Sequence, residues 1–161
     1  MTFLDFVLIT EVPPSIPTLY MVSVLYETGC RPEEFRQFSK SNFTNNYTKI
    51  DFITAKQHTA VSYNLSIGTA NFCNVFLNTW GNNPTFWRTY SQLKRDYLSS
   101  TEQKFLTSSG HEALYYLRYC YVASRMLEGK TELEIKNLLG HTNIETTRIY
   151  MQKAQAIINQ I

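Results

Sequence analysis

Side chains that can perform chemistry lie close together in the C-terminal half of the sequence. Tyr115 and Arg118 are one turn apart in a predicted helix over 111–128, so they project from the same face. An Arg beside a Tyr on a helix is most often a surface or packing pair. The segment KNLLGHTNIETTRIYMQ that follows, however, places His141 just before a predicted helix start and Tyr150 on that helix. A guanidinium can hold anionic oxygens and a tyrosine hydroxyl can act as a nucleophile, so these residues form a candidate site.

The order of these residues resembles the signature of the tyrosine recombinase (phage integrase) family. In that signature an Arg and a long helical segment precede Leu-Gly-His, Thr-Thr and Tyr, and Arg118, the LGH run at 139–141 and Tyr150 match it without a gap. Upstream, LYETGCRPEEF resembles the family's Thr-Gly-x-Arg-x-x-Glu box, which puts Arg31 in the place of the first catalytic arginine, with Glu34 as its support. Two boxes in the family's order, with a predicted hairpin between them, are not easily explained as coincidence.

The resemblance implies a DNA phosphodiester as the substrate and Tyr150 as the nucleophile that forms a covalent 3′-phosphotyrosine. Arg31 and Arg118 are then expected to hold the nonbridging oxygens bidentately, and His141 to donate a further hydrogen bond. The energy of the phosphodiester bond is conserved in the covalent phosphotyrosine bond between enzyme and DNA. Neither a cofactor nor a metal ion is therefore expected. The sequence agrees, because it contains no P-loop and no carboxylate cluster for magnesium.

Two positions match the family pattern less strictly. Lys56, in the expected hairpin, corresponds to the family's catalytic lysine, which would protonate the leaving 5′ oxygen, and Lys49 is the alternative. The family usually has His-x-x-Arg, whereas here Tyr115 stands one turn before the second arginine. We interpret Tyr115 as a support for the pocket, and His111, one turn earlier on the same face, as an alternative source of acid–base chemistry. The proton acceptor for the nucleophile therefore stays open.

The elements that must position these residues are mostly helical. Apolar spacing, capping residues and glycines predict helices over 18–28, 32–38, 71–80, 84–98, 111–128, 131–140 and from a Thr142–Glu145 capping box onward. Period-two patterns in YTKIDFI and TAVSYNLSI predict a hairpin connected by residues 54–58. We therefore expect a mainly α domain with one small antiparallel sheet (α+β), like the catalytic domain of tyrosine recombinases. The apolar stripe expected on the helix over 111–128 is Ala113, Leu117, Cys120, Ser124 and Leu127.

Composition is consistent with one globular domain of 161 residues, with 43% apolar and 14% aromatic residues. No apolar run reaches the length of about 18 residues that a membrane span needs, so no membrane association is expected. The three cysteines lack metal-ligand spacing and indicate reduced thiols, hence a cytoplasmic protein. The family resemblance further implies that the protein is nucleoid-associated. The net charge of +2 is only a weak indication of an anionic partner.

The resemblance covers about residues 10–155 and implies a single catalytic domain over 1–161. Family members usually carry a separate helical domain ahead of it, so we expect the chain to be a fragment of a longer protein. The expected partner is double-stranded DNA, with assembly into a tetramer in synapsis and weak or no self-association without DNA. The final segment MQKAQAIINQI is expected to form an amphipathic tail that packs on a neighbouring protomer through Ala154, Ile157, Ile158 and Ile161.

Site-specific recombination, as integration, excision or dimer resolution, is the function that the strict LGH…Y block favours. Two alternatives stay open. One is nicking and closing of DNA of the type IB topoisomerase kind, which shares fold and chemistry. The other is a non-catalytic DNA-binding relative, to which only Tyr115 points.

Overall fold

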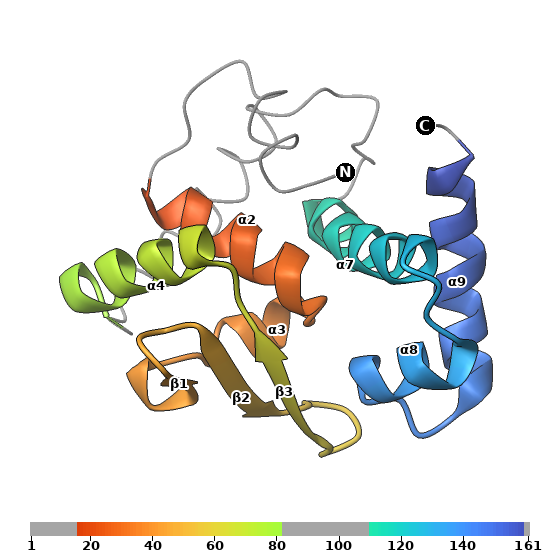
Figure 1. Ribbon diagram of the computed structural model, residues 1–161, viewed down its shortest axis with the longest axis horizontal. Coiled ribbons are helices and arrows are strands. Elements are labelled where there is room, and N and C mark those ends of the chain that lie inside the picture. Colours follow the sequence, from red (N-terminus) through yellow and green to blue (C-terminus); the bar gives the residue numbers. More distant parts are fainter. Residues whose placement is uncertain (1–15, 82–109, 160–161) are drawn as a thin grey trace.

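A computed structural model describes residues 16–81 and 110–159 of the chain. The predicted helix over 84–98 lies outside these residues. Figure 1 shows α4 and the sheet on one side of α2, and α7, α8 and α9 on the other. In chain order the described elements are α2 (Ile16–Thr28), α3 (Pro32–Phe35), the 3-10 turn η1 (Lys40–Asn42), β1 (Phe43–Thr44), β2 (Lys49–Ile53), β3 (Ala60–Asn64), α4 (Ile67–Thr79), α7 (Gly110–Leu127), α8 (Glu132–Leu139) and α9 (Ile144–Ile158).

Helix α2 is the centre of the core. Its sequence is apolar on most sides, which is typical of a helix covered all round. Tyr20, in its middle, is fully buried, with its ring stacked 4.2 Å from that of Phe76 on α4 and 5.1 Å from that of Phe35 on α3. Aromatic pairs at such separations add to the stabilisation from burial alone. The helix therefore joins α3 and α4 into one packed unit.

The sheet has three antiparallel strands in the order β1-β2-β3. Side chains of β2 alternate, so that Ile50 and Phe52 are buried while Asp51 and Ile53 face outward. Ile50 pairs with Tyr63 of β3, and the turn between β2 and β3 reaches toward α8 (Figure 1). The two longer strands confirm the predicted hairpin, and the mainly α fold with one small antiparallel sheet is confirmed with them. The two-residue strand β1 was not predicted, because it is too short to show alternation.

Helix α4 begins earlier than the pattern predicts. Alternation was expected to continue to Ile67, but the hydroxyl of Ser66 accepts a hydrogen bond from the backbone N–H of Thr69 at 3.2 Å and caps a helix that starts at Ile67. The Ile67 side chain is 77% exposed. Helix α3 is shorter than the predicted 32–38, and α2 includes Pro17, which was expected in a loop.

Helix α7 packs against α2 on one side and α9 on the other. Its predicted apolar stripe was wrong at the C-terminal end, since Leu127 is 58% exposed. The buried face instead runs through Leu117, Arg118, Tyr121 and Val122. The predicted stripe included only one side of the helix and left out Arg118, which is 2% exposed. The buried face of α7 thus carries a charge into the interior.

Helix α9 continues well past Tyr150. Its N-cap is Asn143, whose side chain accepts from the N–H of Glu145 at 2.9 Å, so the predicted Thr142–Glu145 capping box is wrong. Residues 151–158 of the segment expected to be a separate tail form the second half of this helix. Ala154 in it is fully buried and Ile158 packs against the core of the same chain. Two of the apolar side chains assigned to a neighbouring protomer are therefore used internally.

The remaining sequence expectations concern cysteines and membranes. All three cysteines are free thiols, Cys30 and Cys73 buried and Cys120 half-buried. Among the described helices, none is both long and apolar enough to cross a membrane.

Candidate active site

Arg31 is fixed at the start of α3 by the turn that ends α2. The Thr28 hydroxyl donates to the Val24 carbonyl at 2.7 Å and accepts from the backbone N–H of Cys30 at 3.1 Å. Arg31 is the N-cap residue of α3, and its backbone N–H donates to Oε1 of Glu34 at 2.7 Å. These local hydrogen bonds hold the Arg31 backbone, and its side chain is only 3% exposed.

Glu34 connects Arg31 to the β2–β3 turn. Its Oε2 atom lies 3.5 Å from Nη1 of Arg31 and accepts from the backbone N–H of Ala55 at 2.8 Å. Both carboxylate oxygens are thereby engaged, and the residue is buried. A buried carboxylate is retained at low cost only when it is paired and hydrogen-bonded in this way. The predicted support of Arg31 by Glu34 is present, and it extends to the hairpin.

Arg118 crosses the interior from α7 to the end of α2. Its Nη1 atom donates to the carbonyl of Gly29, and Nη2 lies 3.2 Å from Nε2 of His141. Gly29 has a φ of +66°, and a Cβ there would lie 2.4 Å from Cδ1 of Tyr121. Only glycine therefore allows the chain to turn this close to α7 and present its carbonyl to the guanidinium.

His141 follows a glycine that is required for a similar reason. Gly140 ends α8 with a φ of +68°, and a Cβ there would lie 2.9 Å from Cγ2 of Thr54. The loop carrying His141 thus contacts the same turn that Glu34 holds. Nδ1 of His141 lies 2.9 Å from the hydroxyl oxygen of Thr147 on α9.

The contacts of His141 define its protonation state. A guanidinium can only donate, so Nε2 of His141 accepts from Arg118, and the ring proton sits on Nδ1 and is donated to Thr147. Burial lowers the pKa of His141 to about 3, helped by the positive charges of Arg118 and Arg31. The imidazole is therefore neutral near pH 7.

Tyr150 lies against this group from α9. The half-buried ring has its centroid 5.3 Å from the ring of His141 and 5.2 Å from that of Tyr119. The Cζ atom of Arg118 lies 5.0 Å from the Tyr150 ring centroid. The structure thus brings Arg118, His141 and Tyr150 into direct contact.

Tyr115 has a partner that the sequence analysis did not identify. Its hydroxyl donates to Glu33, with both carboxylate oxygens 3.2 Å away. Burial raises the pKa of Tyr115, and the charge of Glu33 raises it further. Nothing in the sequence spacing links Glu33 to residue 115. The side chain of His111 lies outside the described part of the structure.

Lys56 is exposed in the β2–β3 turn, next to Ala55, which Glu34 holds. It makes no hydrogen bond or ion pair with another described residue. Lys49 begins β2 and pairs with Asn64, at the end of the hairpin far from this turn. The turn that carries Lys56 is attached to the site, although its side chain does not touch the other predicted residues.

Among the described residues, buried positive charge in this region exceeds buried negative charge. Arg31 and Arg118 are both buried, the imidazole of His141 is neutral, and Glu34 is the one carboxylate that the described residues bury beside them. Within the described residues, Nη1 of Arg31 and Nε of Arg118 have no hydrogen-bond acceptor. Buried donors without acceptors are costly and rare, so this arrangement suits an anion with several oxygens.

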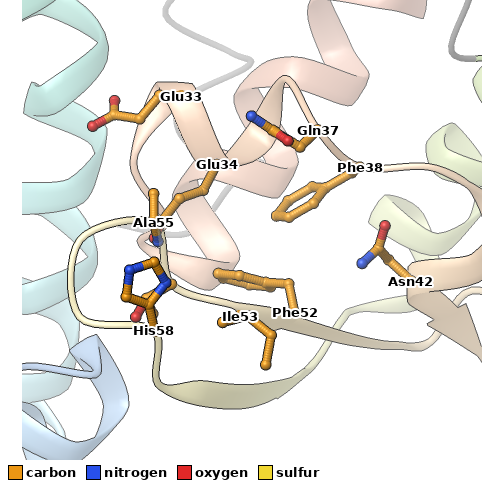
Figure 2. Close-up of a pocket in the computed structure, with 10 residues that line it drawn as sticks. Glu33, Glu34, Gln37, Phe38, Asn42, Phe52, Ile53, Ala55 and His58 are labelled. Carbon is orange, nitrogen blue, oxygen red and sulfur yellow. The ribbon is translucent and has the colours of Figure 1, made fainter.

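A cavity of about 420 Å³ lies between α3 and the hairpin, and Glu34 forms part of its wall (Figure 2). Its walls include Phe38, Phe52 and His58, whereas the two arginines and Tyr150 do not line it. In the described residues no cluster of His, Cys, Asp and Glu side chains could hold a metal ion.

Comparison with known proteins identifies the family. The model of the phage integrase family matches residues 4–156, and the chain belongs to this family. Among solved structures, the catalytic domain of bacteriophage HP1 integrase has 21% identity and a TM-score of 0.61, over 83% of this chain and 73% of that one. XerA recombinase has 18% identity and a TM-score of 0.62, over 91% of this chain and 56% of that one. These likenesses concern the fold.

Two similar structures contain DNA. One is XerH site-specific recombinase on its difH substrate in a post-cleavage complex, with 17% identity and a TM-score of 0.57 over 84% of this chain and 41% of that one. The other is the integrase of transposon Tn1549 with a circular-intermediate DNA, with 12% identity and a TM-score of 0.61 over 99% of this chain and 62% of that one. This chain thus spans about half the length of the Xer recombinases it matches. A search of curated protein sequences finds no match.

Proposed function

We propose that this chain is the catalytic domain of a site-specific DNA recombinase, which cleaves and rejoins DNA through a covalent 3′-phosphotyrosine. One observation carries the proposal. Two buried arginines with unpaired donor atoms meet a neutral histidine and the ring of Tyr150. Arg31 has the Glu34 carboxylate at 3.5 Å but no hydrogen bond from Nη1, and no carboxylate of the described residues pairs with Arg118. A purely structural ion pair would satisfy both arginines within the protein, whereas a phosphate site leaves acceptors to the ligand.

In this proposal the scissile phosphate binds to the unpaired donors. Nη1 of Arg31 and Nε of Arg118 donate to the nonbridging oxygens and stabilise the charge that develops in the transition state. Both side chains are held by contacts that do not involve DNA, through Glu34 for the first and the Gly29 carbonyl for the second. The site is therefore preorganised, and DNA binding need not assemble it.

The chemical step belongs to Tyr150 and Lys56. The phenolic oxygen of Tyr150 attacks phosphorus, the P–O5′ bond breaks, and Lys56 gives a proton to the leaving 5′ oxygen. The reverse sequence rejoins the strand. Lys56 reaches the phosphate from an exposed turn that Glu34 attaches to Arg31, which favours it over Lys49.

Double-stranded DNA is the proposed partner. Two structures of similar fold are DNA complexes, which supports this partner for a member of the same family. We further propose that residues 1–161 are one catalytic domain of a longer, nucleoid-associated protein. Four copies would assemble on DNA in synapsis, with little self-association without it.

A test need not know the target site. The chain is mixed with a library of random-sequence duplexes that carry a single nick, so that cleavage near the nick releases a short strand and traps the enzyme. Adducts that survive denaturation are isolated and their DNA is sequenced. We expect a covalent adduct on an enriched DNA sequence, and we expect it to be lost in Tyr150→Phe. Tyr47→Phe is the control and should keep the adduct, because the Tyr47 hydroxyl accepts a hydrogen bond from Asn78 away from the site.

Other results would favour other functions. Relaxation of supercoiled plasmid with adducts at unrelated sequences indicates a topoisomerase-like enzyme. DNA binding without any adduct, from either this chain or a longer protein that contains it, indicates a non-catalytic relative.

A further inference from the structure

Strand cleavage requires a group that takes the phenolic proton of the nucleophile, because a free tyrosine has a pKa near 10. His141 is one of the neighbours that contact the Tyr150 ring, yet it is poorly suited to this task. Its Nε2 lone pair accepts from Arg118, and two guanidinium groups disfavour a positive charge on the ring. Glu34 is excluded as well, because its oxygens are engaged with Arg31 and Ala55.

Among the described residues, Glu33 is the other carboxylate next to a predicted site residue. Glu33 accepts from the hydroxyl of Tyr115 through both oxygens and makes no other hydrogen bond or ion pair with a described residue. Figure 2 shows its carboxylate pointing away from the cavity, toward α7. It therefore keeps lone pairs that can accept a proton.

Tyr115 binds this carboxylate from α7, the helix that also contacts the nucleophile. It is one turn before Arg118 and one turn before Tyr119 on α7, and these two side chains contact the ring of Tyr150. The negative charge that Tyr150 would carry after ionisation lies close enough to raise the pKa of Tyr115, and Arg31 lowers it. Tyr115 is thus hydrogen-bonded to Glu33, and the charges of Tyr150 and Arg31 act on its hydroxyl.

We propose that Tyr115 and Glu33 form a proton relay that takes the phenolic proton of Tyr150 during cleavage. As the Tyr150 oxygen bonds to phosphorus, its proton passes to the Tyr115 hydroxyl oxygen, and the Tyr115 proton passes to the Glu33 carboxylate. The P–O5′ bond breaks and the 5′ oxygen takes a proton from Lys56. No electrons are exchanged, and rejoining returns each proton along the same path.

This relay rests on the proposed function. It gives a tyrosine at the position of the family's usual histidine a role beyond support, because the carboxylate behind it supplies the basicity that a phenol lacks. Glu33 acts through Tyr115 and does not touch the phosphate. Because Glu33 acts through Tyr115, its negative carboxylate stays away from the DNA phosphate oxygens and is not repelled by them.

The relay is tested by the rate of adduct formation in a single turnover, on the sequence recovered from the nicked library. Glu33→Gln and Tyr115→Phe should each slow the step about a hundredfold at pH 7, the lower end of the range for a lost general base. In Glu33→Gln the rate should then rise about tenfold per pH unit between pH 7 and 9, because hydroxide replaces the relay, whereas the wild-type rate stays flat. Glu128→Gln, which changes an exposed carboxylate just after α7 that pairs with Arg125, is the matched control.

A second readout separates a relay from a structural contact. Replacing Tyr150 by 3,5-difluorotyrosine, a more acidic phenol, should restore much of the rate in Glu33→Gln and add little in the wild type. The double variant Glu33→Gln with Tyr115→Phe should be no slower than either single variant. Equal rates and pH profiles in wild type and variants would overturn the relay and leave the proposed function intact. Absence of any adduct with the wild type would overturn both.

Discussion

Nη2 of Arg118 lies 3.2 Å from Nε2 of His141, and this contact sets the protonation of the histidine. The pairing couples α7 to the loop before α9 and places the only ring proton on the side of Thr147. Since the imidazole is buried and neutral, the folded state disfavours its protonation relative to the unfolded chain.

Protein stability should therefore fall between pH 6.5 and pH 5. The pKa of His141 is about 3 when folded and near 6.5 when unfolded, so in this window the unfolded chain binds one more proton. That contribution is complete above the unfolded pKa and decreases as the pH falls toward the folded pKa. We expect a loss of about 1–2 kcal/mol in the free energy of unfolding by urea at pH 5. His141→Gln should lack this part of the pH dependence, and a parallel loss in both proteins would refute the assignment.

Gly140→Ala should destabilise the protein by about 3 kcal/mol, since an unfavourable φ adds to a collision with Thr54. Gly129→Ala is the matched control. Its φ is +84°, but a Cβ there meets nothing within 4 Å, so only the backbone cost of about 1 kcal/mol is expected. Thr54→Ser removes the colliding Cγ2 and keeps the hydroxyl that accepts from Thr59, so it should partly rescue Gly140→Ala. Thermal and urea unfolding measure all three, and equal effects at the two glycines would contradict the packing argument.

Glu34→Gln should cost about 3 kcal/mol of stability, because it leaves the Arg31 guanidinium buried beside a neutral amide. The amide can also accept only through its single oxygen, so either the Arg31 or the Ala55 backbone N–H loses its partner. Glu145→Gln, in an exposed pair with Arg148, should change stability by less than about 1 kcal/mol. A similar small effect at both positions in urea titrations would show that Arg31 finds another partner.

Lys56→Ala should slow adduct formation on ordinary DNA far more than Lys49→Ala. The defect should disappear when the scissile 5′ oxygen is replaced by sulfur, because a thiolate leaves without receiving a proton. Single-turnover rates on matched oxygen and sulfur substrates provide the measurement. If the sulfur substrate rescues Lys49→Ala and not Lys56→Ala, then Lys49 on β2 is the general acid and the assignment to Lys56 is wrong.

Sequence patterns predicted the fold well where local rules act alone. Helical periodicity gave α2, α7, α8 and α9, and alternation gave the hairpin, because each depends on neighbours within a few residues. The errors arose where a competing local contact intervened. Ser66 ended the strand pattern by capping α4, and Asn143 rather than Thr142 capped α9.

The candidate site was predicted from motifs, and its residues' roles stay predictions. The motifs could place Arg31, Arg118, His141 and Tyr150 in sequence, but not their burial or contacts. The pair of Tyr115 with Glu33 joins residues far apart in the chain, which no periodicity encodes. The apolar stripe predicted on α7 missed the buried Arg118 for the same reason, since a charged residue enters the interior only when distant groups surround it.

The contact of α9 with α7 has a consequence for the making of this protein. Tyr150 reaches Arg118 and His141 only when α9 docks on α7, while Arg31 comes from a helix start synthesised long before. In the proposed recombinase, a chain still emerging from the ribosome would therefore hold its arginines without Tyr150 beside them. Nascent or truncated copies that lack α9 would then be unable to break a DNA strand, because the proposed nucleophile is supplied by the last described helix.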